Sequence, residues 1–209
     1  MKKSLKQLII DTATKYIFLS LIIDGVEKDF VYEEGINNHS VTIIPFIENM
    51  LNKENITLKD IDQVIVGIGP GSYTGVRIGV TVAKMIGYLN NIDVYEVSSL
   101  ALMASHSDKP YVLALIDARR GNAFMGLYGN TGQTLVKINN DTLENIDDYK
   151  NSLEFNYCVV EEGRPCVRKL LNSKLLKKVE DIHSLTPNYL RVTEAERNLR
   201  DESKNKRSV

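Results

Sequence analysis

The chain has 209 residues, of which 43% are hydrophobic and 25% charged, and 26 basic residues nearly balance 27 acidic ones. This composition is typical of a soluble globular protein with one large domain or two small lobes, and the net charge of −1 gives no global sign of binding to nucleic acid or to an anionic membrane. The cysteines and histidines have no metal-ligand spacing, and no apolar run suits a signal peptide or a membrane span. We therefore expect a cytoplasmic protein with no metal site and no cofactor.

The first sixty residues predict strands followed by a helix. "KQLIIDTAT" predicts a buried strand, and the Asp24-Gly25 pair between two apolar runs predicts a hairpin. "NNHSVTIIPFIENMLNKEN" predicts a helix with Pro45 in or near its first turns and with Asn38 or Ser40 as a cap. The apolar positions with helical spacing in this segment are Val41, Ile44, Ile47 and Leu51.

The next segments alternate between strand and helix. "LKDIDQVIVGIG" predicts a strand that is buried on both faces, and "NIDVYEVSSLALMASH" predicts a strand that runs into a short helix. A polar stretch at residues 105–110 predicts a boundary between an N-terminal lobe, 1–104, and a C-terminal lobe, 105–192. Residues 193–209 are predicted to be a charged tail that begins as a helix.

The second lobe restarts with a familiar pattern. "YVLALIDARRGNAFMGLYGNTGQTLVKIN" predicts a strand, a turn and a further strand, as at the start of the chain, which indicates a weak internal repeat. Between residues 141 and 192, "YCVVEEG" predicts a strand, and the path of the rest stays open.

Six of the thirteen glycines lie in "GIGPGSYTGVRIGVTVAKMIG", residues 67–87. A glycine-rich turn before a helix often binds phosphate, because free N–H groups and the helix dipole favour an anion. However, a P-loop requires a lysine after its last glycine, and a dinucleotide loop requires a third glycine, and neither is present. A tight strand-to-helix turn is therefore the favoured interpretation of residues 67–71, and a phosphate site is the less favoured one.

The helix that follows is predicted to start near Tyr73, with Ser72 or Thr74 as its cap. A glycine inside a helix costs about 1 kcal/mol relative to alanine, so several on one stripe suggest that another backbone approaches closely. That backbone belongs either to the chain's own sheet or to a partner helix. The stripe consists of Gly75, Gly79, Ala83 and Gly87, and it is flanked by Val76, Val80, Val82 and Ile86. A helix that is apolar on more than one side is a candidate interface element.

Several segments occur in a recognisable order over essentially the whole chain. They are "IIDTAT", "NNHSVTIIPFIENML", "GIGPGSYTGVRIGVTVAKMIGYLNNIDVYEVSSLALMA", "LIDARRGNAFMGLY" and "PNYLR". Together they resemble the TsaB family, also called YeaZ, and "GPGSYTGVRIG" with the later "SSL" and "IDARRG" is highly specific. The resemblance implies an α/β fold of the actin-like ATPase class (ASKHA, ribonuclease H-like), with two duplicated lobes of which the second is reduced.

The resemblance also implies a function. The family takes part in forming N6-threonylcarbamoyladenosine next to the anticodon of tRNAs that read codons starting with A. It implies a non-catalytic scaffold that binds and activates a TsaD-like protein, which carries the metal and the transfer chemistry. Further implied partners are a TsaE-like ATPase, tRNA contacted indirectly through the complex, and a second copy of the chain when the partner is absent.

In the family, the first two helices of the N-terminal lobe bind the partner. The resemblance therefore favours the partner-helix interpretation of the small-residue stripe. The implied interface residues are Gly75, Val76, Ile78, Gly79, Val82, Ala83, Ile86, Gly87, His39, Ser40, Ile43 and Ile47.

Both phosphate loops of an actin-like ATPase are altered here. The first loop requires a DxGT sequence, and this chain has Ala13 in the place of that glycine. In the second loop "ARRG" follows Asp117, where two glycines are expected. The histidine pair that binds metal in TsaD has no counterpart in this chain, because His39 stands alone. Asp11 and Asp117 are therefore either structural turn residues, which we favour, or residual nucleotide ligands.

Catalysis by this chain alone is accordingly not expected. The alternative hypothesis is an autonomous enzyme, either an actin-like ATPase or kinase or a peptidase-like protein. The altered loops argue against that alternative.

Overall fold

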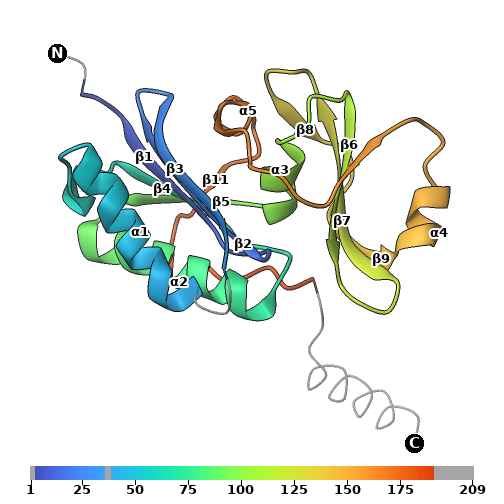
Figure 1. Cartoon of the computed structure of the whole chain (residues 1–209), viewed down its shortest axis with the longest axis horizontal. Coiled ribbons are helices and arrows are strands. Elements are labelled where there is room, and N and C mark those ends of the chain that lie inside the picture. The colour runs from blue at the N-terminus through green and yellow to red at the C-terminus, as the bar shows by residue number, and fades with distance from the viewer. Residues whose placement is uncertain (1–2, 36–38, 191–209) are drawn as a thin grey trace, which may run out of the picture.

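Two β-sheets face each other in the computed structural model, which describes residues 3–35 and 39–190 (Figure 1). The first sheet has the strand order β11-β5-β4-β1-β2-β3. Strand β1 pairs in antiparallel fashion with β2 and in parallel fashion with β4, which in turn is parallel to β5. The strands of this sheet are β1 (Lys6–Asp11), β2 (Tyr16–Ile23), β3 (Val26–Glu34), β4 (Gln63–Gly67), β5 (Asp93–Val97) and β11 (Lys177–Lys178).

The second sheet repeats the core of the first. Its order β10-β6-β7-β8 corresponds to β4-β1-β2-β3, since β6 is antiparallel to β7 and parallel to β10. The described residues contain no counterpart of β5 in this sheet, and the repeat predicted from the sequence is therefore present in a reduced form. The strands are β6 (Tyr111–Asp117), β7 (Asn122–Asn130), β8 (Leu135–Lys137) and β10 (Cys158–Val160), with β9 (Thr142–Asn145) paired to β7.

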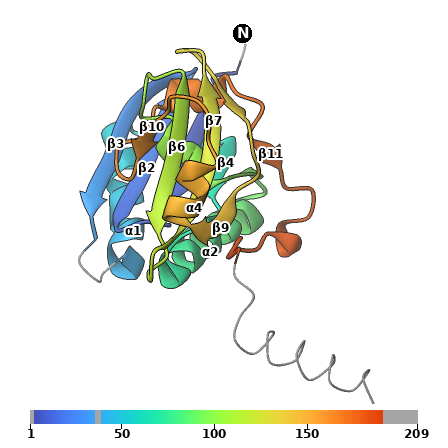
Figure 2. The ribbon, with the colours of Figure 1, turned by 90° about the vertical axis from the view of Figure 1, so that its right-hand side faces the viewer.

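The helices form three layers relative to the two sheets (Figures 1 and 2). Helices α1 (His39–Lys53) and α2 (Tyr73–Asn90) cover one face of the first sheet, and α3 (Ser99–Ala104) lies between the two sheets. Helix α4 (Ile146–Asn151) packs on the outer face of the second sheet. The remaining helices are α5 (Val167–Leu171) and the 3₁₀ turns Leu58–Asp60 and Ile182–Ser184.

Two main apolar cores follow from this layering. One lies between the first sheet and the α1–α2 layer. The other lies between the two sheets and combines side chains of β1, β2 and β4 with those of α3, β6 and β7. All six residues of α3 are buried, so this short helix fills the space between the sheets.

Most local predictions for the first lobe are confirmed. Asp24 and Gly25 both have positive φ, 52° and 78°, as the tight β2–β3 hairpin turn requires. Strand β4 is buried along Val64–Val66, which fits its parallel neighbours on both sides. Helix α2 starts at Tyr73, and the Ser72 hydroxyl accepts a hydrogen bond from the Gly75 amide at 3.2 Å.

The prediction for α1 was partly wrong. The helix begins at His39, so Ser40 is inside it and is not the cap, while Asn38 lies outside the described residues. Val41 and Ile44 are exposed rather than buried. The core-facing positions are Ile43, Ile47, Met50 and Leu51, because the helix is rotated relative to the predicted apolar face.

The last described segment returns to the first sheet, because β11 pairs with β5. The lobe boundary at residue 104 stays a prediction. Strand β11 belongs to the predicted C-terminal lobe by sequence but is part of the first sheet. The predicted tail, 193–209, lies outside the described residues. In the described parts, no helix combines the length and apolar character that crossing a membrane requires.

Candidate functional site

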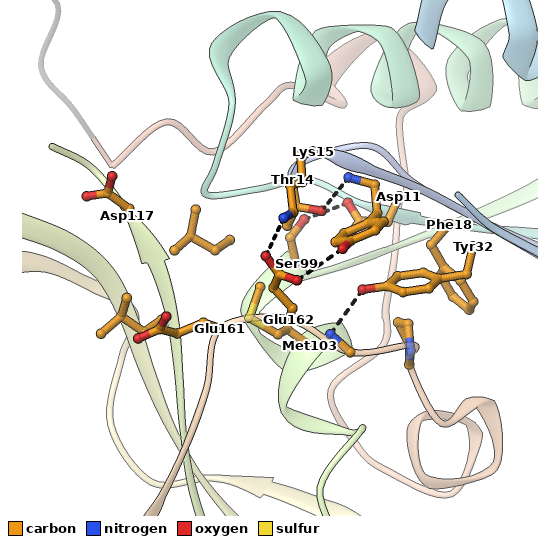
Figure 3. Close-up of a pocket in the computed structure, with 15 residues that line it drawn as sticks. Asp11, Thr14, Lys15, Phe18, Tyr32, Ser99, Met103, Asp117, Glu161 and Glu162 are labelled. Atoms are coloured by element: carbon orange, nitrogen blue, oxygen red, sulfur yellow. Dashed lines mark hydrogen bonds and ion pairs between the residues drawn. The ribbon is translucent and has the colours of Figure 1, made fainter. Parts of the chain in front are cut away.

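A cavity of about 270 Å³ lies between the two sheets, where the resemblance would place a nucleotide (Figure 3). Asp11, Phe18 and Tyr32 come from the first sheet, while Asp117 and Glu161 come from the side of the second. The carboxyl ends of β1 and β6, two equivalent strands, therefore contribute one aspartate each to the same cavity.

Asp11 is held by the protein's own groups. Its Oδ1 atom accepts hydrogen bonds from the Ala13 amide at 3.1 Å and from the Ser99 hydroxyl at 2.9 Å. Ser99 also accepts a hydrogen bond from the Gly69 amide, so the carboxylate connects β1, α3 and the glycine loop. Burial raises the pKa of Asp11 to about 6, although these hydrogen bonds favour the charged form. Gly67 has no side chain here, and a Cβ at that position would overlap the Asp11 carboxylate.

Asp117 has a different environment. It is exposed, and its Oδ1 atom accepts a hydrogen bond from the Arg119 amide at 2.8 Å. Arg119, Arg120 and Gly121 all have positive φ and are exposed, so the "DARRG" segment forms a tight, solvated turn. Both aspartates thus stabilise local backbone, which supports the interpretation of turn residues over that of nucleotide ligands.

The backbone of the first phosphate loop is also engaged. The Ala13 carbonyl accepts a hydrogen bond from the Ser72 amide at 2.7 Å. The Thr12 hydroxyl donates to the Gly75 carbonyl at 2.6 Å and accepts from the Gly79 amide at 3.0 Å. The middle of this loop, Thr12 and Ala13, is therefore bonded to the start of α2, while Asp11 and Thr14 line the cavity.

The electrostatics of the cavity disfavour a polyphosphate. Four carboxylates line it, and its single lining cation, Lys15, forms an ion pair with Glu162. Hydrogen bonds from Lys15 and from the Tyr16 hydroxyl lower the pKa of Glu162, so this carboxylate is charged at neutral pH. At such short range these carboxylates would repel the negative charges of a polyphosphate. The described residues also contain no group of three potential metal ligands among histidine, cysteine, aspartate and glutamate.

The structure corrects the partner-helix interpretation of the small-residue stripe on α2. A Cβ on Gly75 would overlap the Thr12 carbonyl oxygen, and one on Gly79 would lie 2.6 Å from the Thr12 hydroxyl oxygen. Likewise, a Cβ on Gly87 would overlap the side chain of Val94. Ala83 is completely buried in the same core. The stripe therefore lets α2 approach the chain's own first sheet.

Other predicted interface residues are also inside the fold. Val76, Ile86, Ile43 and Ile47 are buried in the core between the first sheet and its two helices. The resemblance placed them at an interface because the first two helices bind the partner in the family, and sequence spacing alone does not tell which side of such a helix meets the sheet.

Three predicted residues do lie toward solvent. Ser40 is exposed, and Ile78 and Val82 are half-buried, and all three line a shallow groove between α1 and α2 together with Tyr73 and Arg77. The side chain of His39 lies outside what the structure describes.

Large apolar side chains lie exposed or half-buried on the solvent side of α1 and α2, and among them Tyr73, Met85, Tyr88 and Leu89 were not predicted to be interface residues. We call the set the outer face: Val41, Ile44, Tyr73, Ile78, Val82, Met85, Tyr88 and Leu89. For Met85, Tyr88 and Leu89, the signal that could have found them is a spacing of three or four residues that continues from Ile78 and Val82 along α2, on the side opposite to the glycines.

Comparisons with known proteins agree with this architecture. Residues 30–178 match the family model described as TsaD: tRNA N6-adenosine threonylcarbamoyltransferase. The tRNA threonylcarbamoyladenosine biosynthesis protein TsaB of Bacillus subtilis is 30% identical, over 90% of this chain and 95% of that protein. Its Escherichia coli counterpart is 34% identical over 58% of this chain and 54% of that protein. The crystal structure of YeaZ from Pseudomonas aeruginosa superposes with a TM-score of 0.74 at 21% identity, over 89% of this chain and 100% of that one.

The duplicated strand order and the cleft between the two sheets define a protein of the actin-like ATPase fold. Within that class, the relation to the Bacillus subtilis protein extends over nearly the full length of both chains. The chain belongs to the TsaB (YeaZ) family.

Proposed function

We propose that this chain is a non-catalytic subunit that binds a TsaD-like protein and supports it in forming N6-threonylcarbamoyladenosine in tRNA. The names of the curated relatives and the match to the TsaD family model support this proposal. The observation that carries it is the outer face of α1 and α2, which presents large apolar side chains next to a groove.

Single exposed apolar residues are ordinary, but a contiguous set marks an interaction site. The outer face combines two aromatic residues with aliphatic ones, the types that dominate binding energy at interfaces. Behind it, the glycine stripe fixes α2 firmly against the first sheet. A rigid helix presented in this way loses little conformational entropy when a partner binds.

The state of the cleft supports a non-catalytic role. The first loop is engaged by α2, and the carboxylates of the cavity oppose a polyphosphate. We place the chemistry in the TsaD-like partner. A TsaE-like ATPase and tRNA join through that partner in the cytoplasm, and a second copy of the chain uses the same outer face when the partner is absent.

The test is a binding titration with the TsaD-like protein of the same organism. Met85→Glu and Val41→Glu place a charge in the outer face, and each is expected to weaken binding by about tenfold or more, because a buried unpaired charge opposes association. The control is Val136→Glu on β8, where the exposed fraction of 57% matches the 55% of Met85.

All three residues are exposed, so the free energy of unfolding should change by less than about 0.5 kcal/mol. If Met85→Glu and Val41→Glu bind as well as the control does, the outer face is not the docking surface. Sedimentation of the isolated chains tests the homodimer in the same way, since the outer-face variants should be monomeric at concentrations where the control dimerises.

A further inference from the structure

The loop of residues 161–165, which follows β10, reaches from the second sheet to the first. It contacts the hairpin formed by β2 and β3 and contributes Glu161, Glu162, Gly163 and Pro165 to the wall of the cavity. Figure 3 shows this loop beside the labelled side chains of Lys15 and Tyr32. We call residues 161–165 the bridging loop.

The first anchor of the bridging loop is Glu162. Its carboxylate pairs with Lys15 and accepts a hydrogen bond from the Tyr16 hydroxyl at 3.0 Å. The next amide, that of Gly163, donates to the Tyr32 hydroxyl at 3.0 Å. The rings of Tyr16 and Tyr32 stack with their centroids 4.5 Å apart, so one stacked pair donates one hydrogen bond to the loop and accepts another from it.

The second anchor is Arg164. Its guanidinium donates to Glu27 at 2.9 Å and lies over the ring of Phe30, 4.1 Å from the ring centroid. Glu27 is itself fixed by a hydrogen bond from the Ser20 hydroxyl at 2.8 Å. The loop is thus attached to the hairpin at two separate points.

On its other side, the bridging loop is fixed to the end of α3. The His106 ring lies 3.1 Å from the Arg164 carbonyl oxygen, and the Cys166 amide donates to the Ser105 hydroxyl at 2.8 Å. Gly163 has φ of +148°, and a Cβ there would overlap the His106 ring. The loop therefore has a defined path between the two sheets.

The position of these bonds at the cavity wall lets them control the access of solvent to the cavity. Lys15 and Glu162 are about half exposed, whereas Asp11 and Met103, which line the same cavity, are buried. The bridging loop thus forms the solvent side of the cavity. Deeper in the molecule, the sheets are held together by α3 and the shared apolar core, which can serve as a fixed pivot.

We propose that the bridging loop is a latch that closes the cavity between the two sheets with the chain's own side chains. Release of its two anchors from the β2–β3 hairpin opens the cavity to solvent while both sheets remain folded. This latch is independent of the outer face, which lies on the opposite side of the first sheet.

The test measures access to the cavity. Met103→Cys, in a chain in which Cys158 and Cys166 are replaced by serine, places a single thiol in the cavity wall. The rate of its reaction with Ellman's reagent reports how often the cavity opens. With both anchors removed by Glu162→Ala and Arg164→Ala, this rate is expected to rise by about tenfold or more, because the opening no longer breaks those bonds.

The matched control is the Lys178–Asp93 pair. Its side chains are 44% and 49% exposed, against 49% and 53% for Lys15 and Glu162, but both lie in the first sheet. Removing the control pair should leave the thiol reaction unchanged. The proposal is overturned if the anchor variant reacts no faster than this control. It is equally overturned if the faster reaction only matches a loss of global stability, measured by urea unfolding of the same proteins.

Discussion

The carboxyl group of Asp11 is buried at the point where β1, α3 and the glycine loop meet. Burial raises its pKa from 3.8 to about 6, a shift of about two units that corresponds to roughly 3 kcal/mol at neutral pH. The folded chain therefore carries an energetic cost at this residue when the carboxyl is charged. In return, the carboxylate fixes three segments that come from distant parts of the chain.

The raised pKa of Asp11 makes the stability of the folded chain depend on pH. Between pH 4 and pH 6 the folded state binds more protons at Asp11 than the unfolded state, so stability due to this group falls as pH rises. In Asp11→Asn this contribution is absent. The free energy of unfolding of the variant minus that of the wild type should therefore rise by up to about 3 kcal/mol from pH 4 to pH 7 and then level off. Urea unfolding at each pH measures it, and a difference that stays flat with pH would contradict the raised pKa.

At this scale the sequence was informative about position but not about environment. The resemblance identified Asp11 and Asp117 as a pair because they occupy the two phosphate-loop positions of the fold. In the structure each ends a strand and both line one cavity. The burial of Asp11 could not be predicted, because Ser99 and Gly67, which surround it, belong to other segments. For the same reason, nothing in the sequence indicated the bridging loop. Its partners in the β2–β3 hairpin are more than 120 residues earlier in the chain.

Helix α2 has two working sides. Its glycine side lies against Thr12, in the loop after β1, and against Val94 of β5, and its other side belongs to the outer face. The close approach of the glycine side to the chain's own core thus fixes the position of the outer face. This coupling explains why the helix contains residues that are otherwise poor helix formers.

Gly75→Ala should therefore destabilise the chain. Alanine gains up to about 1 kcal/mol of helix propensity, but its Cβ would overlap the Thr12 carbonyl oxygen, a backbone atom that cannot move freely. Overpacking of this kind costs about 1–3 kcal/mol or more, so we expect a net loss of free energy of unfolding in a urea titration.

Thr81→Ala, at an exposed position of the same helix, is the control and should be neutral or slightly stabilising. If Gly75→Ala raises the stability as Thr81→Ala does, the glycine does not contact the first sheet as described.

The spacing of small residues predicted the stripe correctly, but it did not predict which part of the structure packs against the stripe. Glycines four apart fit either a sheet or a partner helix, and the deciding contacts come from Thr12, which precedes α2 by some sixty residues. The resemblance to a family with helical interfaces favoured the partner. The stripe instead faces the chain's own core, and whether α1 and α2 bind a partner stays a proposal.

In the whole molecule, the two sheets share one core. Ile9 and Ile65 of the first sheet pack in the same cluster as Val112 and Phe124 of the second, with Leu100 of α3 among them. The duplicated topology and the alternation of strands and helices were accessible from the sequence. The shared core was not, because it depends on which faces of the two sheets meet.

A shared core predicts one cooperative unfolding transition rather than two. Exposing the inner face of either sheet removes the apolar partner of the other, so neither should remain folded alone. Far-ultraviolet circular dichroism and tyrosine fluorescence should give the same urea midpoint, since tyrosines occur in both halves of the chain. Separate midpoints would show that the two sheets unfold independently.

The pairing of β11 with β5 has a consequence for the chain during its synthesis. On the ribosome, the first sheet can form up to β5 long before Lys177 and Lys178 have been made. Until then β5 is an open edge, with unpaired amide and carbonyl groups that can pair with another nascent chain. All strands of the second sheet must therefore be synthesised before the edge of the first sheet is covered.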